Sequence, residues 1–150
     1  NQILFRSEHI SFYTRLLEGN YPDTDRLIPT EFNTEATFNV ANLRFAMERA
    51  RLLSNATQNG TVKLEFKNGV VSSHVHSPEV GRVNEEIDTS AVSGEDLSIS
   101  FNPTYLIEAL KAIDSEQVVI RFISSVRPFT LVPEGNEQGF IQLITPVRTN

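Results

Sequence analysis

The sequence contains no cysteine. Disulfide bonds and metal sites built on thiolates are therefore excluded, and a reducing compartment is indicated. No apolar run approaches the ~20 residues that a membrane-spanning helix needs. The sequence also lacks a glycine-rich phosphate loop, a Ser–His–Asp arrangement and a suitably spaced acidic pair, and its seven glycines are scattered among predicted turns. The sequence therefore predicts neither a catalytic group nor a cofactor.

Positive charge is scarce as well. Thirteen Lys and Arg stand against 19 Asp and Glu, which gives a formal net charge of −6 and argues against nonspecific nucleic-acid binding by the whole surface. The charge is uneven, however. Residues 40–54 carry three arginines and one acid, whereas residues 79–96 carry six acids and one base. Such asymmetry occurs in partner surfaces and in ordinary solvated faces, and composition alone favours the second.

A strand–helix–strand pattern is written twice in the chain. Each copy opens with Phe-Asn, at 38–39 and at 101–102, continues with apolar residues at helical spacing, and ends in an alternating strand. An internal repeat of this kind defines the architecture before any single motif does. We predict an α+β fold with two helices packed on antiparallel sheets, with one helix and four strands in each copy.

The predicted elements follow from periodicity and from local signals. Asn39 and Asn102 are good helix N-caps, and Asn68-Gly69 is a hairpin signal. We expect helices over residues 40–54 and from 103 to about 114, and strands over 35–38, 61–67, 70–76, about 80–87, 97–101, 117–123, 129–132 and 140–145.

The first 33 residues read differently from the rest. Two short strands are predicted between residues 3 and 18, with a helix over residues 12–17 as the alternative because short apolar runs are ambiguous. A turn-rich stretch with two prolines follows. A lone two-stranded hairpin is marginally stable. We therefore expect residues 1–33 to be the end of a preceding domain plus a linker, and residues 34–150 to form a second domain. Since the chain starts at Asn1 without a leader, we also expect a segment of a longer protein.

Two apolar surfaces are candidates for contacts. Phe45 and Leu52 lie opposite the core face of the predicted helix 40–54, and exposed apolar side chains cost solubility unless something covers them. A subunit contact is slightly favoured over cover by another part of the same chain. Residues 80–87 are predicted to form an edge strand, which either repels partners by charge or accepts one by strand addition.

His74 and His76 are predicted to lie on one face of a strand, with Glu79 nearby. Two histidines and a carboxylate suit a metal ion, although paired surface histidines on strands are ordinary. Two alternative functions therefore remain open. One is a metal-dependent hydrolase at these residues, and the other is a structural adaptor that uses the edge strand 80–87.

Several separate motifs occur in order along the whole chain: Tyr21-Pro22-Asp23 with Arg26-Leu27-Ile28-Pro29, Ala50-x-Leu52-Leu53-Ser54-Asn55, Phe101-Asn102-x-x-Tyr105-Leu106, Val126-Arg127-Pro128-Phe129 and Pro146-Val147-Arg148. Together they resemble the bacterial sliding-clamp family, the beta subunits of DNA polymerase III. The resemblance implies the DNA clamp fold. It also implies that residues 1–33 are the C-terminal hairpin of the middle clamp domain plus a linker, and that residues 34–150 are the C-terminal clamp domain.

The resemblance further implies a function. Members of this family are non-catalytic, cytoplasmic accessory subunits of DNA-directed DNA polymerase. They form a head-to-tail homodimeric ring around duplex DNA, without sequence preference, and a clamp loader places them there. They bind the alpha subunit of DNA polymerase III and other proteins through a short peptide motif in an apolar groove. By this resemblance, we expect the first domain and most of the second to lie outside the 150 residues, and to supply the rest of the groove and of the ring.

Site residues carry over by position. The resemblance implies a peptide-binding groove made by Pro22, Arg26, Leu27, Tyr105, Val126, Pro128, Leu143, Thr145, Pro146, Val147 and Arg148. It implies a ring contact at Leu52, Leu53, Glu85 and Glu86, to which the exposed stripe on the first helix adds Phe45. Residues on or near the pore helices, which would attract DNA phosphates, are Arg44, Arg49, Arg51 and Lys111.

Overall fold

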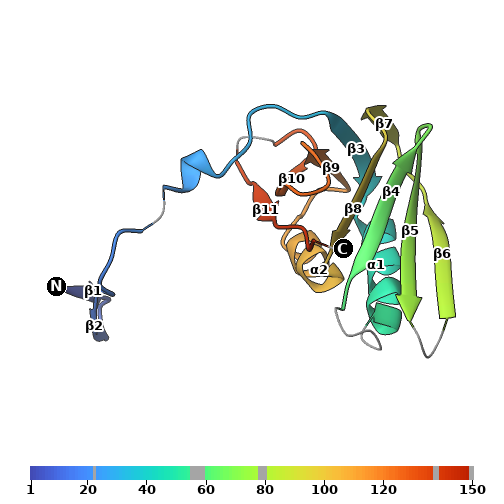
Figure 1. Cartoon of the computed structure of the whole chain (residues 1–150). Coiled ribbons are helices and arrows are strands. Elements are labelled where there is room, and N and C mark those ends of the chain that lie inside the picture. The colour runs from blue at the N-terminus through green and yellow to red at the C-terminus, as the bar shows by residue number, and fades with distance from the viewer. Residues whose placement is uncertain (22, 55–59, 78–80, 137–138, 149–150) are drawn as a thin grey trace.

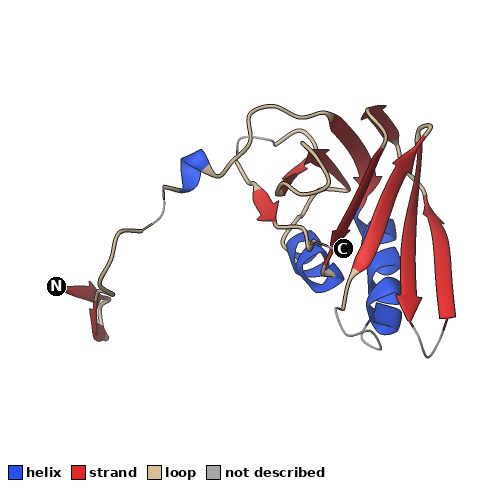
Figure 2. Ribbon diagram, viewed as in Figure 1, coloured by secondary structure: helices blue, strands red, loops and turns tan. Residues whose placement is uncertain are grey.

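The computed structural model describes residues 1–21, 23–54, 60–77, 81–136 and 139–148. The chain is α+β, as predicted (Figures 1 and 2). Its helices are α1 (Val40–Ser54) and α2 (Pro103–Lys111), with a short 3-10 turn, η1 (Thr24–Arg26). Its strands are β1 (Gln2–Arg6), β2 (Ser11–Arg15), β3 (Thr34–Asn39), β4 (Val62–Lys67), β5 (Val70–Ser77), β6 (Gly81–Ile87), β7 (Ala91–Gly94), β8 (Leu97–Phe101), β9 (Gln117–Phe122), β10 (Phe129–Pro133) and β11 (Gln142–Ile144).

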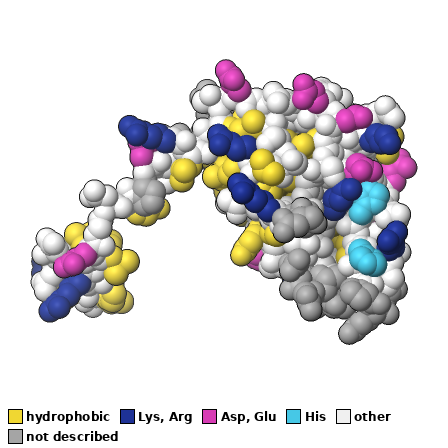
Figure 3. Space-filling view, viewed as in Figure 1, with side chains coloured by type: hydrophobic (Ala, Val, Ile, Leu, Met, Phe, Trp, Pro, Cys, Tyr) yellow, Lys and Arg dark blue, Asp and Glu magenta, His cyan; other side chains and the backbone are white. Residues whose placement is uncertain are grey.

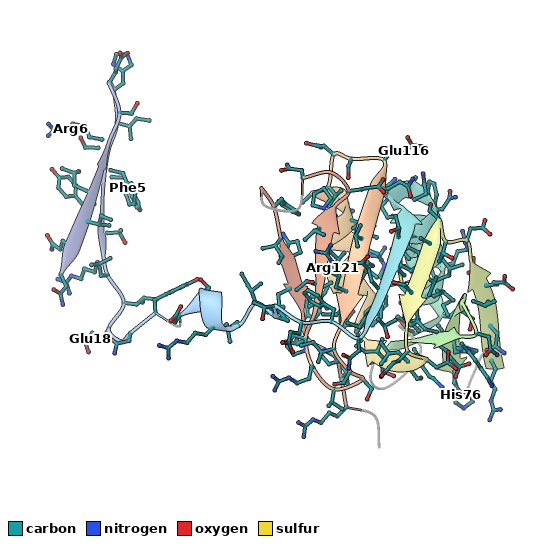
Figure 4. The ribbon with its side chains drawn as sticks, turned by 90° about the horizontal axis from the view of Figure 1, so that it is seen from above. Phe5, Arg6, Glu18, His76, Glu116 and Arg121 are labelled. Carbon is teal, nitrogen blue, oxygen red and sulfur yellow. The ribbon has the colours of Figure 1, made fainter. Side chains whose placement is uncertain are left out.

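The N-terminal hairpin stands apart from the body of the molecule. Strands β1 and β2 pair antiparallel, which confirms the predicted hairpin. Figure 4 shows Phe5 and Arg6 on this hairpin, well away from the body that carries Arg121 and His76. The apolar side chains of the hairpin, Phe12 among them, stay exposed. Whether residues 1–33 belong with a preceding domain stays a prediction, and exposed apolar side chains are the kind of surface that another part of a protein covers.

The two repeats exchange their first strands. One sheet has the order β11-β10-β9-β3-β7, and the other has the order β6-β5-β4-β8. Strand β3, which opens the first repeat, pairs with β9 of the second, whereas β8, which opens the second, pairs with β4 of the first. This exchange makes the two repeats one folded unit.

Three details of the prediction were wrong. Strand β7 was missed, because only Val92 of its four residues is a large apolar side chain and acids flank it on both sides. The first repeat therefore contributes more strands than the four expected. Helix α2 ends at Lys111, before the expected residue 114, and β11 covers only Gln142–Ile144.

Both helices begin at the predicted caps. The side-chain oxygen of Asn39 accepts a hydrogen bond from the backbone N–H of Asn42 at 3.0 Å. That of Asn102 accepts from the N–H of Thr104 at 2.9 Å, and Pro103 occupies the first turn, where a missing N–H costs nothing. The helices contact each other and lie side by side (Figure 1).

Phenylalanine rings join the two sheets across the core. Phe66 on β4 lies 4.9 Å from Phe122 on β9, and Phe101 on β8 lies 5.2 Å from Phe129 on β10, measured between ring centroids. Each fully buried ring stabilises the fold by about 1.5–3 kcal/mol relative to exposure. None of the helices in the described part of the chain has the length and apolar character to cross a bilayer.

Candidate functional site

The C-terminal segment passes from one sheet to the other. Strand β11 pairs with β10 in the first sheet. Three residues further on, the backbone N–H of Val147 donates a 2.7 Å hydrogen bond to the carbonyl oxygen of Ser100, on the free edge of β8 in the second sheet. Pro146, which has no N–H to offer a strand, lies between the two attachments. The segment leaves one hollow against α2 and another against β8.

The first hollow, called here the α2–β11 hollow, has a volume of about 440 Å³. Helix α2 contributes Tyr105, Glu108 and Ala109, whose spacing places them on one face of the helix. The phenol ring of Tyr105 is prominent, with 59% of the residue exposed. The other lining residues come from the C-terminal segment: Gln142, Leu143, Ile144 and Thr145. The described lining of this hollow is about equally apolar and polar, and it includes one acid, Glu108.

The second hollow, called here the β8 hollow, also measures about 440 Å³. Its two apolar side chains are Val126 and Val147, and its remaining lining residues are Lys63, Ser98, Ser100, Ser125 and Arg148. Lys63 stands opposite Ser100 in the β4–β8 pairing, so both project from the outer face of that sheet. Dark-blue Lys and Arg side chains surround a yellow apolar area on this face of the molecule (Figure 3).

Six of the residues predicted for the groove line these two hollows. Tyr105, Leu143 and Thr145 line the first, and Val126, Val147 and Arg148 line the second.

The remaining predicted groove residues lie elsewhere or between the hollows. Pro146 is half-buried at the divide, and Pro128 is half-buried just before β10. On the linker, Arg26 pairs with Asp23 at 2.9 Å and Leu27 is 54% exposed; neither lines either hollow. Pro22 lies outside the described residues. Whether the linker closes the groove therefore stays a prediction.

Part of this lining was not predicted from the sequence. The unpredicted residues are Lys63 and the three serines on the β8 side, and Glu108, Ala109, Gln142 and Ile144 on the α2 side. The alternation Leu97-Ser98-Ile99-Ser100 already indicates that the serines of β8 face outward. It does not reveal that the C-terminal segment docks beside them.

A third hollow, of about 240 Å³, lies between α1 and the edge strand β6. It brings together three residues predicted for the ring contact, Phe45, Glu85 and Glu86. Leu52 is more exposed than Phe45, at 71% against 50%, whereas Leu53 packs partly against the core. The prediction of β6 as an edge strand is confirmed.

Arg49 and Glu85 connect α1 to β6. The guanidinium Nε of Arg49 donates to Glu85 Oε2 at 3.3 Å, and its Nη2 donates to the other carboxylate oxygen. This hydrogen bond to Glu85 raises the pKa of the Arg49 guanidinium above its ordinary range. A raised pKa on a basic group stabilises the fold at pH values below the pKa of the unfolded state, so Arg49 contributes through this contact across the physiological pH range.

The other candidates for attracting DNA occupy both helices. Arg44 lies 3.8 Å from Glu48 and stacks over Phe45, with its guanidinium carbon 5.4 Å from the ring centroid. Arg51 is half-buried in the last turn of α1. Lys111 pairs with Glu108 at 2.9 Å on α2.

The histidine candidates do not form a three-ligand set. His74 Nδ1 lies 2.7 Å from Asn84 Oδ1 and His74 Nε2 lies 2.9 Å from Ser72 Oγ, so both ring nitrogens have partners. His76 shares that face of β5, and Glu79 lies outside the described residues. Within the residues that the structure describes, no three His, Asp or Glu side chains gather where a metal ion would need them.

Comparison with known proteins agrees with this geometry. Residues 25–148 match the family described as DNA polymerase III beta subunit, C-terminal domain. The chain is 79% identical over its full length to the beta sliding clamp of Streptococcus pneumoniae TIGR4 and 57% identical to that of Lactococcus lactis, and it covers 40% of each. A crystal structure of the Streptococcus pneumoniae DNA polymerase III beta chain superposes with a TM-score of 0.92 over 99% of this chain and 40% of the other.

A two-helix α+β body with exchanged first strands and a docked C-terminal segment thus defines a clamp domain. The chain belongs to the bacterial sliding-clamp family, the DNA polymerase III beta subunits, and corresponds to their C-terminal part. It spans about 40% of the length of the relatives it matches.

Proposed function

We propose that this chain is the C-terminal, partner-binding part of a non-catalytic processivity clamp in bacterial DNA replication. In the full-length protein it forms part of a cytoplasmic homodimeric ring that encircles duplex DNA after loading by a clamp loader. Polymerase and other proteins bind to it through a short peptide motif. The proposal rests mainly on the docking of the C-terminal segment, which produces two hollows side by side.

The two hollows suit a peptide with apolar anchors. Each offers apolar side chains, such as Leu143 in the α2–β11 hollow and Val147 in the β8 hollow, beside a few polar groups that fix orientation. Aromatic side chains at the centre of an interface often carry much of the binding energy, and Tyr105 is positioned for that role. Leu27 and Pro22 of the linker complete the groove in this proposal.

The ring contact and the DNA contact use other surfaces. Leu52, Leu53, Phe45, Glu85 and Glu86 form an apolar patch with an ionic rim at the α1–β6 side, and the partner subunit covers it. Arg44, Arg49, Arg51 and Lys111 contribute long-range attraction to phosphates, which requires no base contact. A chain of net charge −6 holds DNA in this proposal by encirclement, with local cations and not overall charge as the electrostatic aid.

A binding measurement tests the proposal directly. A fluorescein-labelled peptide with Leu and Phe anchors is titrated with this chain and followed by fluorescence anisotropy. Its matched control carries Ala in place of both anchors. We expect saturable binding of the first peptide and at least tenfold weaker binding of the second, because burial of two apolar side chains is lost. Equal affinity for the two peptides would contradict the proposal.

A further inference from the structure

The two hollows differ in charge. Among the described residues, the α2–β11 hollow is lined by one acid, Glu108, and by no Lys or Arg. The β8 hollow is lined by two cations, Lys63 and Arg148, and by three serine hydroxyls, with no acid among the described residues that line it. Hydroxyls and cations together are donors suited to a carboxylate.

The cations of the β8 hollow are available to a ligand. Lys63 Nζ lies 3.5 Å from Glu65 Oε1, at the long end of an ion pair, and its side chain is 46% exposed. Glu65 also lies 3.5 Å from His74 Nε2, so this carboxylate is shared between two neighbours. Arg148 is exposed, and no acidic partner stands within ion-pair distance of it among the described residues.

We propose that the β8 hollow binds an acidic side chain of the partner peptide, next to the apolar anchors. This inference rests on the proposed peptide-binding function and adds a specificity determinant to it. Lys63 and Arg148 attract the carboxylate electrostatically, and the hydroxyls of Ser98, Ser100 and Ser125 supply hydrogen-bond donors. Val126 and Val147 in the same wall connect this polar end to the apolar part of the groove.

A peptide carboxylate fits this hollow better than a phosphate of the DNA backbone. The two valines place apolar surface beside the cations. DNA phosphates are bound by polar and charged groups, so this apolar surface would contribute nothing to their binding. The hollow is also continuous with the docked C-terminal segment that lines the peptide groove.

The test uses matched peptides and matched lysine variants. The labelled Leu/Phe peptide is made as a series in which one position at a time outside the anchors carries Asp or Asn. At one position or more, we expect Asp to bind the unmodified chain about threefold to tenfold more tightly than Asn, as partly exposed charge-assisted contacts allow. In Lys63→Gln this preference falls to about onefold, and added salt weakens it in the unmodified chain.

Lys67→Gln is the control. Lys67 is exposed on β4 and lies on the same face of the strand as Lys63, because every second residue of a strand faces the same way. It does not line the β8 hollow. The control keeps the full preference for Asp, although it removes the same charge.

The outcomes separate the two proposals. If no position discriminates Asp from Asn, or if Lys63→Gln keeps the preference, the inference fails while binding of the Asn peptides still supports the groove. If neither peptide binds, the groove itself fails and the inference with it. If Lys63→Gln instead weakens binding of a short labelled duplex DNA and leaves the Asp preference intact, the cations serve phosphate and the inference is overturned.

Discussion

The backbone N–H of Val147 and the carbonyl oxygen of Ser100 are 2.7 Å apart. This hydrogen bond lies at the free edge of β8, where unpaired backbone groups would otherwise face water. It fixes the chain terminus beside the second sheet after β11 has ended in the first. Both candidate peptide hollows depend on that path, because each takes lining residues from the C-terminal segment.

Removal of the docked segment is expected to abolish peptide binding. A chain ending at Thr145 loses the Val147–Ser100 hydrogen bond and the apolar wall of the β8 hollow, whereas a chain ending at Arg148 keeps both. We expect at least a tenfold loss of affinity in the first and none in the second, measured by anisotropy. Circular dichroism establishes that both are folded. Retained binding by the shorter chain would favour the adaptor function that uses the β6 edge.

Substitution of Leu27 tests whether the linker completes the groove. Leu27 is exposed directly after η1, so Leu27→Asp leaves the core intact. If this residue contacts the peptide anchors, the variant places an unpaired charge in an apolar site, and we expect affinity to fall more than tenfold. Val70→Asp, at an exposed apolar position outside all three hollows, is the control and binds normally. Unchanged affinity in Leu27→Asp would place the linker outside the groove.

Assembly is tested at Leu52 in the full-length protein. Leu52→Asp puts a charge in the centre of the proposed subunit contact, and we expect light scattering to show a shift from dimer to monomer. We expect the unsubstituted protein to stay on circular duplex DNA and to slide off linear DNA, and the variant to be retained on neither. Val70→Asp again serves as the control and stays dimeric. A dimeric Leu52→Asp protein would show that the contact lies elsewhere.

Gly94 is expected to be intolerant of a side chain. Its φ is +99°, and an added Cβ would lie 1.9 Å from the carbonyl oxygen of Asn33, where β7 meets β3. Gly69 also has a positive φ, +78°, but nothing lies within 4 Å of its Cβ position. In urea unfolding we expect Gly69→Ala to cost about 1 kcal/mol, from backbone strain alone. We expect Gly94→Ala to cost about 2 kcal/mol more than that, from the added clash. Equal losses would mean that the backbone relaxes around Gly94.

Local signals were enough to predict most of the secondary structure. The Asn39 and Asn102 caps and the Asn68-Gly69 turn act through bonds within a few residues, so the sequence shows them directly. Strand β7 was not predicted, because it is short and its stability comes from pairing with β3, which lies far away in the sequence.

The site residues also divide into those that a local sequence pattern predicts and those that it does not. Exposure of Phe45 and Leu52 followed from helical periodicity, since a position opposite the core face must face outward. The lining of the β8 hollow did not follow from any local pattern, because Lys63, Ser98 and Val147 come from three separate stretches of the sequence. Only family resemblance connected Tyr105 with the C-terminal residues before the fold was known.

The sequence by itself determined the repeated strand–helix–strand units, their caps and turns, and the family, because these depend on neighbouring residues and on motif order. Tertiary structure decided that the repeats exchange their first strands and that Val147 reaches Ser100. Those contacts join residues distant in the chain, and their energies come from burial and edge pairing that no local pattern encodes.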